Sequence, residues 1–521
     1  MAEQEWTEVA KVGDLKEGVP VSIKAHGEKV LLVRVGGAIH ACEGKCRHYG
    51  APLEEGLLLG HVITCPWHNA RFDVRTGRMV SPPALTSLAR YPVKVEDGVV
   101  YLGPAEKPKA PRIEGKDDRT FAIVGGGAAG NAAAETLREE GFAGKVLLIT
   151  AEAELPYDRP TLSKDFLSGE ASREWLPLHN TKYYERRQIE LLLEQRVAAI
   201  DPDKKVLSLA DGAEIRFDAA LLATGGAPRK PDIPGTHLDG FFLLRSAADA
   251  EAIVAALDRT KRAVILGAGF IGMEAASSLR ERELEVHVVA PEQVPMARVF
   301  GDEVGRWLRR QHEQKGVIFH LGRTATEIRG DGRVKEVALS DGSTVGADIV
   351  IAGIGVTPAV DCLRGTGLAA DGAVPVDGRL ATEAEGIYAA GDIALVPDPW
   401  TGERHRVEHW IVAERQGQHA ARAMLGSDAP YSEVPFFWTK QGGASLKYVG
   451  YGGEYDRVAV RGSIEDGDFL AGYYAGGRLL AASGAGRARE IAVAAEILRA
   501  GENVPPERLA DEETDLRGYL T

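Results

Sequence analysis

The sequence has little cysteine and no long apolar run. Four cysteines occur in 521 residues, namely Cys42, Cys46, Cys65 and Cys362, too few for the disulfide framework of a secreted scaffold. No apolar stretch is long enough to span a bilayer. The first segment, MAEQEWTEVA, lacks the apolar centre of a secretory signal, and its acidic residues argue against a transit peptide. These absences make the cytoplasm the expected compartment.

Clustered positive charge is also lacking. The chain has 76 acidic and 62 basic residues, a formal net charge of −14, and no Lys/Arg-rich run resembles a nucleic-acid footprint. Nucleic acid is therefore not an expected partner. With 44% hydrophobic residues, the chain can bury several cores and should fold as several domains.

The first part of the chain has the pattern of short strands. VLLVRV-GG-AIHAC and VKVED-G-VVYL both predict hairpins. The stretch PAEKPKAPRIEGKDD that follows is rich in proline and charge, which is typical of a solvated linker. We therefore predict an all-β domain over residues 1–104 and a linker over residues 105–118.

Beyond the linker, the order strand, glycine turn, helix and strand occurs twice. FAIVGGGAAG begins one copy and RAVILGAGFIG begins the other, each typical of an α/β dinucleotide-binding, Rossmann-like domain. The later run GIYAAGDIA indicates that the chain returns to the first copy, so the second is an insertion. The expected domains are an FAD-binding domain over residues 119–245 and 376–430, an NAD(P)-binding domain over 246–375, and a C-terminal α+β domain over 431–521.

Two short loops each supply one cysteine and one histidine. Cys46-x-His48 precedes Cys65-x-x-His68, and a Rieske [2Fe-2S] cluster needs two thiolates on one iron and two imidazoles on the other. A tetrahedral zinc site uses the same kinds of atom. Zinc fingers, however, usually pair cysteine with cysteine and histidine with histidine. The interleaved order favours the iron-sulfur cluster, with all four residues as metal ligands.

On these motifs, residues 5 to 103 resemble the Rieske ferredoxin family. The resemblance implies that the two histidines bind the outer iron. Asn69 stands where glycine commonly follows the last histidine, and Tyr49 is an unusual neighbour of the first. The extra cysteines of respiratory-complex Rieske proteins are absent, so the resemblance implies the lower-potential ferredoxin type. Cys42 is expected to be an ordinary buried thiol.

Glycine motifs predict two nucleotide sites, one for FAD and one for NAD(P). Each motif follows an apolar strand and opens a helix, which directs backbone amides at a pyrophosphate. The motif glycines are Gly125, Gly127 and Gly130 in the first copy, and Gly267, Gly269 and Gly272 in the second.

The residues after the next strand of each copy bear on the ribose. Glu152 is the candidate acid for the adenosine ribose of the first site. In the second copy Ala290 is neutral, Glu292 lies two residues on, and no arginine occurs before Arg298. An acid favours the free 2′-hydroxyl and an arginine favours a 2′-phosphate. The sequence therefore favours NADH, without excluding NADPH.

The motifs LPYDRPTLSK, ALLATGG and IYAAGDIA make the chain from residue 119 to about residue 500 resemble the flavoprotein reductase family that includes apoptosis-inducing factor and the putidaredoxin and rubredoxin reductases. The resemblance implies flavin contacts from Arg159, Lys164, Thr224, Gly225 and Asp392. RVEHWIVAERQG and PFFWTKQ match the stretches at the isoalloxazine edge, and GFIGMEAA matches positions that contact flavin and nicotinamide. These stretches imply roles for Glu408, His409, Trp410, Trp438, Phe270 and Glu274, of which Phe270, Glu274, Glu408 and His409 are the expected catalytic residues.

Disulfide reductases of the wider superfamily carry a CxxxxC pair after the first nucleotide motif. The corresponding stretch, AAGNAAAETLREE, has no cysteine, and Cys362 is expected to be structural. Electrons must therefore leave the flavin by another route, which a fused cluster provides. We predict an NAD(P)H-dependent flavoprotein oxidoreductase that passes electrons through FAD and the cluster to an unidentified acceptor protein. The alternative is an NADH-sensing, redox-regulated interaction protein of the apoptosis-inducing factor type. The sequence leaves open whether the chain forms a homodimer.

Overall fold

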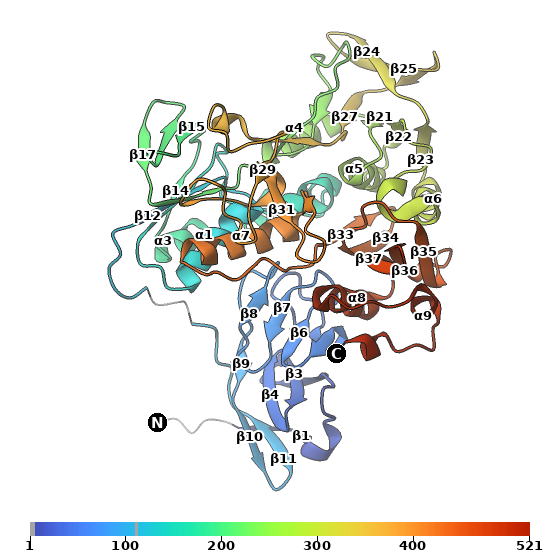
Figure 1. Ribbon diagram of the computed structural model, residues 1–521. Helices are drawn as coiled ribbons and strands as arrows, with labels where there is room; N and C mark the ends of the chain where they lie inside the picture. The colour runs from blue at the N-terminus through green and yellow to red at the C-terminus, as the bar shows by residue number, and fades with distance from the viewer. Residues whose placement is uncertain (1–5, 110–112, 521) are drawn as a thin grey trace.

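The computed structural model describes residues 6–109 and 113–520. The outermost residues of the predicted domains, 1–5 and Thr521, and residues 110–112 of the predicted linker lie outside the described residues. An all-β region lies below two parallel-sheet units and an antiparallel sheet (Figure 1). This arrangement confirms the predicted multidomain fold class. In the described part of the chain, no helix combines the length and apolarity needed to cross a membrane.

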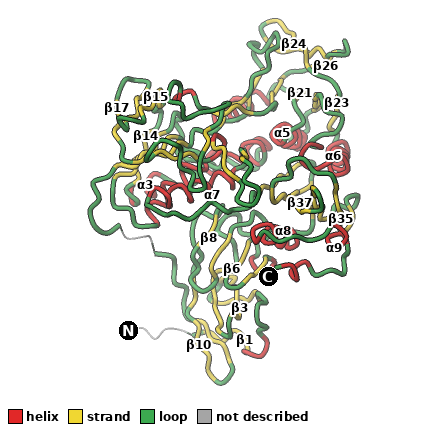
Figure 2. The backbone as a smooth tube through the Cα atoms, in the orientation of Figure 1, coloured by secondary structure: helices red, strands yellow, loops and turns green. Residues whose placement is uncertain are grey.

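The all-β region consists of strands and loops with short helical turns (Figure 2). Its sheets have the orders β2-β3-β4-β9, β5-β6-β7-β8 and β1-β11-β10. Both predicted hairpins are confirmed: β3 pairs with β4 around Gly36 and Gly37, and β10 with β11 around Asp97 and Gly98. All four turn residues have positive φ, as tight hairpins require. The strands are β1 (Thr7–Lys11), β2 (Val21–Ala25), β3 (Glu28–Val35), β4 (Ala38–Glu43), β5 (Leu57–Leu59), β6 (Val62–Thr64), β7 (Arg71–Asp73), β8 (Met79–Ser81), β9 (Arg90–Tyr91), β10 (Val93–Glu96) and β11 (Val99–Leu102).

The first nucleotide-binding unit is built on a parallel sheet of order β14-β13-β12-β18-β30. Strand β30 pairs with β18, which confirms that the chain returns to this sheet after the second unit. Helices α1 and α7 lie side by side below the sheet (Figures 1 and 2). The elements are β12 (Thr120–Val124), α1 (Ala128–Glu139), β13 (Lys145–Ile149), α2 (Asp165–Ser168), α3 (Thr181–Arg186), β14 (Ile189–Leu192), β18 (Ala219–Leu222), β30 (Ile387–Ala389) and α7 (Trp410–Met424), with smaller sheets of β15 (Val197–Asp201), β16 (Val206–Leu209) and β17 (Glu214–Arg216), and of β29 (Val374–Pro375), β31 (Ala394–Pro397) and β32 (Arg404–His405).

The second unit repeats the parallel plan with the order β20-β27-β21-β22-β23. Its central strands are buried on both faces, as expected where helices cover a parallel sheet. A short antiparallel ribbon of β19 and β28 connects it with the first unit. The elements are β19 (Gly226–Pro228), β20 (Phe241–Leu243), α4 (Ala247–Leu257), β21 (Arg262–Leu266), α5 (Phe270–Glu281), β22 (Glu285–Ala290), α6 (Ala297–Gln314), β23 (Val317–Leu321), β24 (Ala325–Asp331), β25 (Arg333–Leu339), β26 (Thr344–Gly346), β27 (Ile349–Ala352) and β28 (Val356–Pro358).

The C-terminal region is an antiparallel sheet of order β33-β34-β37-β36-β35 with two helices. Leu57 of β5 is buried in one hydrophobic core with Ile491 and Ile497 of α8, so the all-β region packs directly on this region. The elements are β33 (Phe436–Gln441), β34 (Ala444–Gly450), β35 (Arg457–Ser463), β36 (Asp468–Ala475), β37 (Arg478–Ala485), α8 (Ala488–Ala500) and α9 (Pro506–Ala510).

Candidate redox site

Both glycine turns bring a helix against the turn that precedes it. Gly125 and Gly267 have φ of +119° and +101°, a region that glycine adopts readily. A Cβ on Gly130 would lie 1.8 Å from the carbonyl oxygen of Gly125, and one on Gly272 would lie 2.2 Å from that of Gly267. The first and last glycines of each GxGxxG motif are therefore required by conformation and packing, and each helix presents its first backbone amides at the turn.

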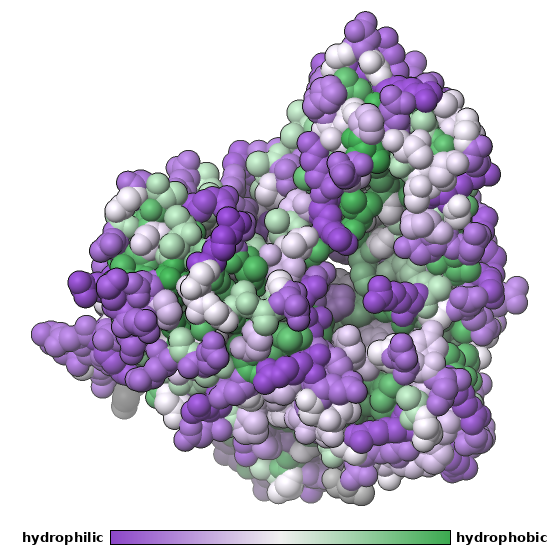
Figure 3. Space-filling view, turned by 45° about the horizontal axis from the view of Figure 1, so that its top comes forward, coloured by the Kyte–Doolittle hydropathy of each residue, from purple (hydrophilic) through white to green (hydrophobic). Residues whose placement is uncertain are grey.

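A cavity of about 850 Å³ lies where the two units meet the C-terminal sheet, a volume in the range of cofactor sites. The surface is hollowed between two lobes, with hydrophobic side chains inside the hollow (Figure 3). Most of the predicted site residues line this cavity: Gly125, Gly127, Glu152, Arg159, Lys164, Thr224, Gly225, Gly269, Phe270, Glu274, Asp392, Glu408, His409, Trp410 and Trp438.

Four predicted nucleotide-site residues are not among the lining residues. Gly130, Gly267 and Gly272 belong to the turn and helix packing just described. Glu292 is exposed beyond the end of β22. Ala290, at the end of that strand, is buried, so a side chain that reaches a ribose from this edge has to come from a residue further along.

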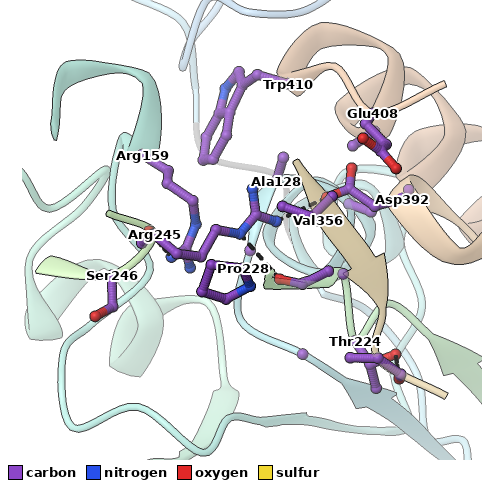
Figure 4. A pocket seen from close by; sticks show the side chains of 18 of the residues that line it. Ala128, Arg159, Thr224, Pro228, Arg245, Ser246, Val356, Asp392, Glu408 and Trp410 are labelled. Carbon is purple, nitrogen blue, oxygen red and sulfur yellow. Dashed lines mark hydrogen bonds and ion pairs between the residues drawn. The ribbon is translucent and has the colours of Figure 1, made fainter. Parts of the chain in front are cut away.

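Opposite charges meet inside the cavity. Arg159 donates to Glu152 over 2.7 Å, and the hydroxyl of Tyr157 donates to the same carboxylate over 2.6 Å. Arg245 donates to Asp392 over 2.7 Å and to the carbonyl of Gly226 over 3.1 Å. Arg159, Arg245 and Trp410 point into the same space (Figure 4). The guanidinium groups of Arg159 and Arg245 can pair with the negative charge of a bound pyrophosphate.

Arg245 is not among the site residues that the sequence predicts. Its signal is the segment Arg245-Ser246-Ala247-Ala248-Asp249, in which Ser246 and Asp249 form a capping box at the start of α4. A capping box marks a helix N-terminus from sequence alone. The local pattern does not predict that this helix begins beside the cavity, because that position depends on the tertiary structure.

A buried carboxylate joins the two units to the C-terminal sheet. Glu274 of α5 is 3% exposed. It accepts hydrogen bonds from Lys164 over 2.7 Å, from Ser163 over 2.6 Å and from Thr439 over 2.7 Å. Lys164 and Glu274, which the sequence assigns to flavin and nicotinamide, are therefore an ion pair on the cavity wall, and Thr439 completes it.

Aromatic rings form another part of the wall. His409 stacks on Phe437 at 4.0 Å between ring centroids, and Phe270 lies edge-on 5.7 Å from His409. Burial lowers the pKa of His409 to about 4, so its imidazole is neutral at pH 7. Glu408 is paired with Arg406. This wall can position an aromatic ring system and offers a neutral imidazole beside it.

The four predicted cluster ligands lie together at the tips of two matching loops. Cys46 donates its backbone N–H to Ala51, and Cys65 donates in the same way to Ala70. The Cys46 and Cys65 thiols are close enough to shift each other's pKa, and both are buried. The Nδ1 atoms of His48 and His68 are 2.9 Å apart. The donors thus form one sulfur pair and one nitrogen pair, which fits two irons with two ligands each.

A single tetrahedral ion fits this arrangement less well. Within residues 6–109 and 113–520, no group of three or more His, Cys, Asp or Glu side chains is gathered around one metal position. Cys42 is buried on β4, and burial raises its pKa to about 12, in keeping with the predicted inert thiol.

One side chain touches both the cavity and the cluster ligands. Trp438 of β33 lines the cavity. Its ring centroid lies 4.3 Å from that of His68 and 6.2 Å from that of His48. The imidazole side of the cluster loops therefore faces the reductase units, with one indole between.

Comparisons with known proteins match all three regions. Family models match at residues 5–92 (Rieske [2Fe-2S] domain), 119–417 (pyridine nucleotide-disulphide oxidoreductase) and 436–520 (reductase C-terminal). Human apoptosis-inducing factor 3 is 36% identical over 95% of this chain and 84% of its own length. The ferredoxin–NAD(+) reductase component of the anthranilate 1,2-dioxygenase system of Burkholderia cepacia is 34% identical over 77% of this chain and 99% of its own length.

Among solved structures, the covalent putidaredoxin reductase–putidaredoxin complex contains a chain with a TM-score of 0.74 and 31% identity, covering 78% of this chain and 99% of that one. The matches and the donor geometry agree on the cofactors, which are FAD, NAD(P)H and a [2Fe-2S] cluster. The chain is an FAD-dependent oxidoreductase that belongs to the pyridine nucleotide-disulphide oxidoreductase family and carries a Rieske domain at its amino-terminal end.

Proposed function

We propose that the chain transfers electrons from NADH to an external one-electron acceptor protein, with the fused cluster domain as the exit from the flavin site. FAD supplies hydride acceptance and the [2Fe-2S] cluster supplies one-electron transfer. The observation that carries the proposal is the position of Trp438 between the cavity and His68. One indole ring spans the distance between the two redox sites, so the domains need no rearrangement to exchange electrons.

The chain's own residues form two nucleotide sites. We assign the FAD pyrophosphate to the amides after Gly125 and Gly127, and the adenosine ribose to Glu152. Arg159, Arg245 and Asp392 line the same part of the cavity and fix charge and orientation there. The second motif, with Gly267, Gly269 and Gly272, receives the NADH pyrophosphate, with Glu292 at its ribose.

The catalytic assignments follow from where the two nucleotide sites meet. Phe270 and Glu274 begin α5 of the second unit, yet both line the cavity of the first. Phe270 and His409 pack edge to face, which shapes a slot for a ring and excludes water. Glu274 accepts a hydrogen bond from Lys164 and holds that side chain in place, and a fixed ammonium group can hold a proton near a reacting nitrogen. Glu408 lies at the rim.

The acceptor class rests on the relatives. One is named as a ferredoxin–NAD(+) reductase component, and a solved relative is bound to putidaredoxin. We infer a ferredoxin-type acceptor in the cytoplasm, and NADH rather than NADPH as the donor. The same relatives favour electron transfer over the alternative function as an NADH-sensing interaction protein.

The experiment compares His68→Ala with His61→Ala in the holoprotein. His61 belongs to the same domain but lies outside the cluster loops and pairs with Asp73. Stopped-flow mixing with NADH should bleach the flavin at the wild-type rate in both variants. Reduction of an oxidised [2Fe-2S] ferredoxin should collapse in His68→Ala only. If His68→Ala reduces the ferredoxin as fast as wild type, the cluster is not the exit and the sensing function gains support.

A further inference from the structure

The residue that follows each cluster histidine is attached to the reductase. After His48, the hydroxyl of Tyr49 donates to Asp158 and lies 3.3 Å from the hydroxyl of Thr161. Asp158 immediately precedes Arg159, which lines the flavin cavity. The first cluster loop is thereby anchored on a segment that belongs to the flavin site.

The second cluster loop has a matching anchor. After His68, the side-chain oxygen of Asn69 accepts a hydrogen bond from Arg415 over 2.7 Å, and its backbone carbonyl accepts a second over 3.2 Å. Arg415 also donates to Ser81 of β8 over 3.0 Å. Its side chain is 2% exposed. It lies on α7, whose first residue, Trp410, lines the same cavity.

The two residue types suit this task. Asn69 has φ of +62°, a conformation that asparagine tolerates better than most residues. Glycine would adopt it equally well but would take from the buried guanidinium of Arg415 one of its two side-chain acceptors, the other being Ser81, and an unmet buried donor is costly. Tyr49 packs its ring 4.0 Å from that of His48 and carries the hydroxyl that reaches Asp158.

A buried ionic cluster supports the second anchor. Glu433 lies 3.8 Å from Arg415 and also pairs with Arg71 of the all-β region and Arg499 of α8. One carboxylate thus joins all three regions around the contact between Asn69 and Arg415. Removing one partner from a buried ionic set is strongly unfavourable, so this interface resists opening.

We propose that Tyr49 and Asn69 are positioning residues that hold the two histidine ligands at a fixed place against the flavin cavity. The proposal rests on the proposed function, in which electrons leave the flavin through the cluster. It adds that the cluster domain stays docked on the reductase, with the contact between His68 and Trp438 kept through turnover.

The test uses variants that change one contact each. Tyr49→Phe keeps the ring on His48 and removes the hydroxyl. Asn69→Gly keeps the backbone conformation and removes the acceptor, whereas Asn69→Asp keeps both and should rescue. Arg78→Met is the matched control, because Arg78 crosses the same interface to Glu140 over 3.1 Å but is 62% exposed and lies outside the cluster loops.

The main measurement is a single turnover in the stopped flow. Bleaching of the flavin by NADH should stay within about twofold of wild type in every variant, while cluster reduction should slow about tenfold in Tyr49→Phe and in Asn69→Gly, since small displacements of reacting groups have large kinetic effects. Asn69→Asp and Arg78→Met should match wild type. A double variant that reduces its cluster at the wild-type rate would overturn the positioning role.

A second measurement does not depend on electron transfer. Hydrogen–deuterium exchange of the oxidised holoprotein over residues 46–50 and 65–70 should rise in the double variant and not in Arg78→Met. If NADH fails to reduce the cluster of the wild-type protein, the proposed function is wrong. In that case the exchange result decides the anchoring: increased exchange supports it, and unchanged exchange overturns it.

Discussion

The two nucleotide-binding units have the same arrangement of strand, glycine turn and helix. They differ in what packs against the helix that follows the turn. Gly417 of α7 approaches α1 so closely that a Cβ there would lie 2.1 Å from the carbonyl oxygen of Ala129, and Ala129 itself is 4% exposed. In the second unit, Ile271 of α5 is 40% exposed. In the first unit, α7 covers the helix that follows the glycine turn. In the second unit, the start of the corresponding helix α5 is partly exposed to solvent.

This difference matches a resident cofactor and an exchanging one. A cofactor that stays bound benefits from an enclosed site, because every polar group of the site can be satisfied by fixed protein partners. A substrate that must leave in each cycle needs an open edge. The strand-end acids follow the same division, since Glu152 is paired with Arg159 inside the cavity and Glu292 is exposed. Two glycine turns of the same spacing therefore belong to two kinds of site, and the difference lies in the elements that pack against them.

Disruption of the glycine turn in the first unit should have the largest effect. In Gly130→Ala the new Cβ would meet the carbonyl oxygen of Gly125 at 1.8 Å, and backbone on both sides prevents relief. We expect purified protein with little or no FAD, measured as the ratio of flavin to protein absorbance. A full complement of FAD would show that the turn does not hold this cofactor.

The matching change in the second unit should have a smaller and different effect. Gly272→Ala places its Cβ 2.2 Å from the carbonyl oxygen of Gly267 but leaves the first unit intact. FAD should remain, and flavin bleaching by NADH should slow on the order of 100-fold, the scale expected for a misplaced substrate. Dithionite, which needs no nucleotide site, should still bleach the flavin. Equal loss of FAD in both variants would contradict the separation of the sites.

The exposed edge of the second unit can be used to change nucleotide preference. Because Ala290 is buried, a charge is better introduced at Glu292, which is exposed. Glu292→Arg should shift the ratio of kcat/KM for NADPH to that for NADH upward by about tenfold, since arginine can pair with a 2′-phosphate. Steady-state kinetics with both nucleotides measure this ratio. Glu283→Arg, at the turn before β22, serves as a control for added charge. An unchanged ratio would mean that Glu292 does not contact the ribose of the nicotinamide nucleotide.

The smallest effect is expected at the ionic cluster in which Glu433 pairs with Arg71, Arg415 and Arg499. These arginines lower the pKa of Glu433 to about 2. A carboxyl whose folded-state pKa lies below its unfolded value of 4.5 stabilises the fold above pH 4.5, and this contribution is lost as the pH falls toward 2. Glu433→Gln should therefore lower Tm at pH 7 by a few degrees, because one kcal/mol shifts Tm by about 2–4 °C in a protein of 150–250 residues and by less in a longer chain.

The difference in Tm between Glu433→Gln and wild type should shrink as the pH falls below 4.5, because the wild-type carboxyl then binds a proton in the unfolded state and, near pH 2, in the folded state as well. Differential scanning calorimetry across this range measures it. Glu140→Gln is the control, since its partners Arg78 and Arg422 lie at the surface and such pairs contribute little. A difference that stays constant with pH would mean that the charge of Glu433 does not stabilise the interface.

Much of the molecule could be predicted because its signals are local. Hairpins with Gly36 and Gly37 in their turn, the two glycine turns and the two Cys/His loops each depend on backbone conformations that a few adjacent residues set. The fold class and the cofactors were predicted from these patterns and are confirmed. The separate role of each site residue stays a prediction, although most of those residues line one cavity.

Contacts between distant segments could not be predicted in this way. Lys164 pairs with Glu274, Arg245 with Asp392, and Asn69 with Arg415 across 110, 147 and 346 residues of sequence. Nothing in one segment specifies its partner, because the pairing depends on how whole domains pack. The motifs thus allowed the cofactor chemistry to be predicted from the residues. The position of His68 beside Trp438 depends instead on packing between domains, where buried polar groups must find partners from other segments.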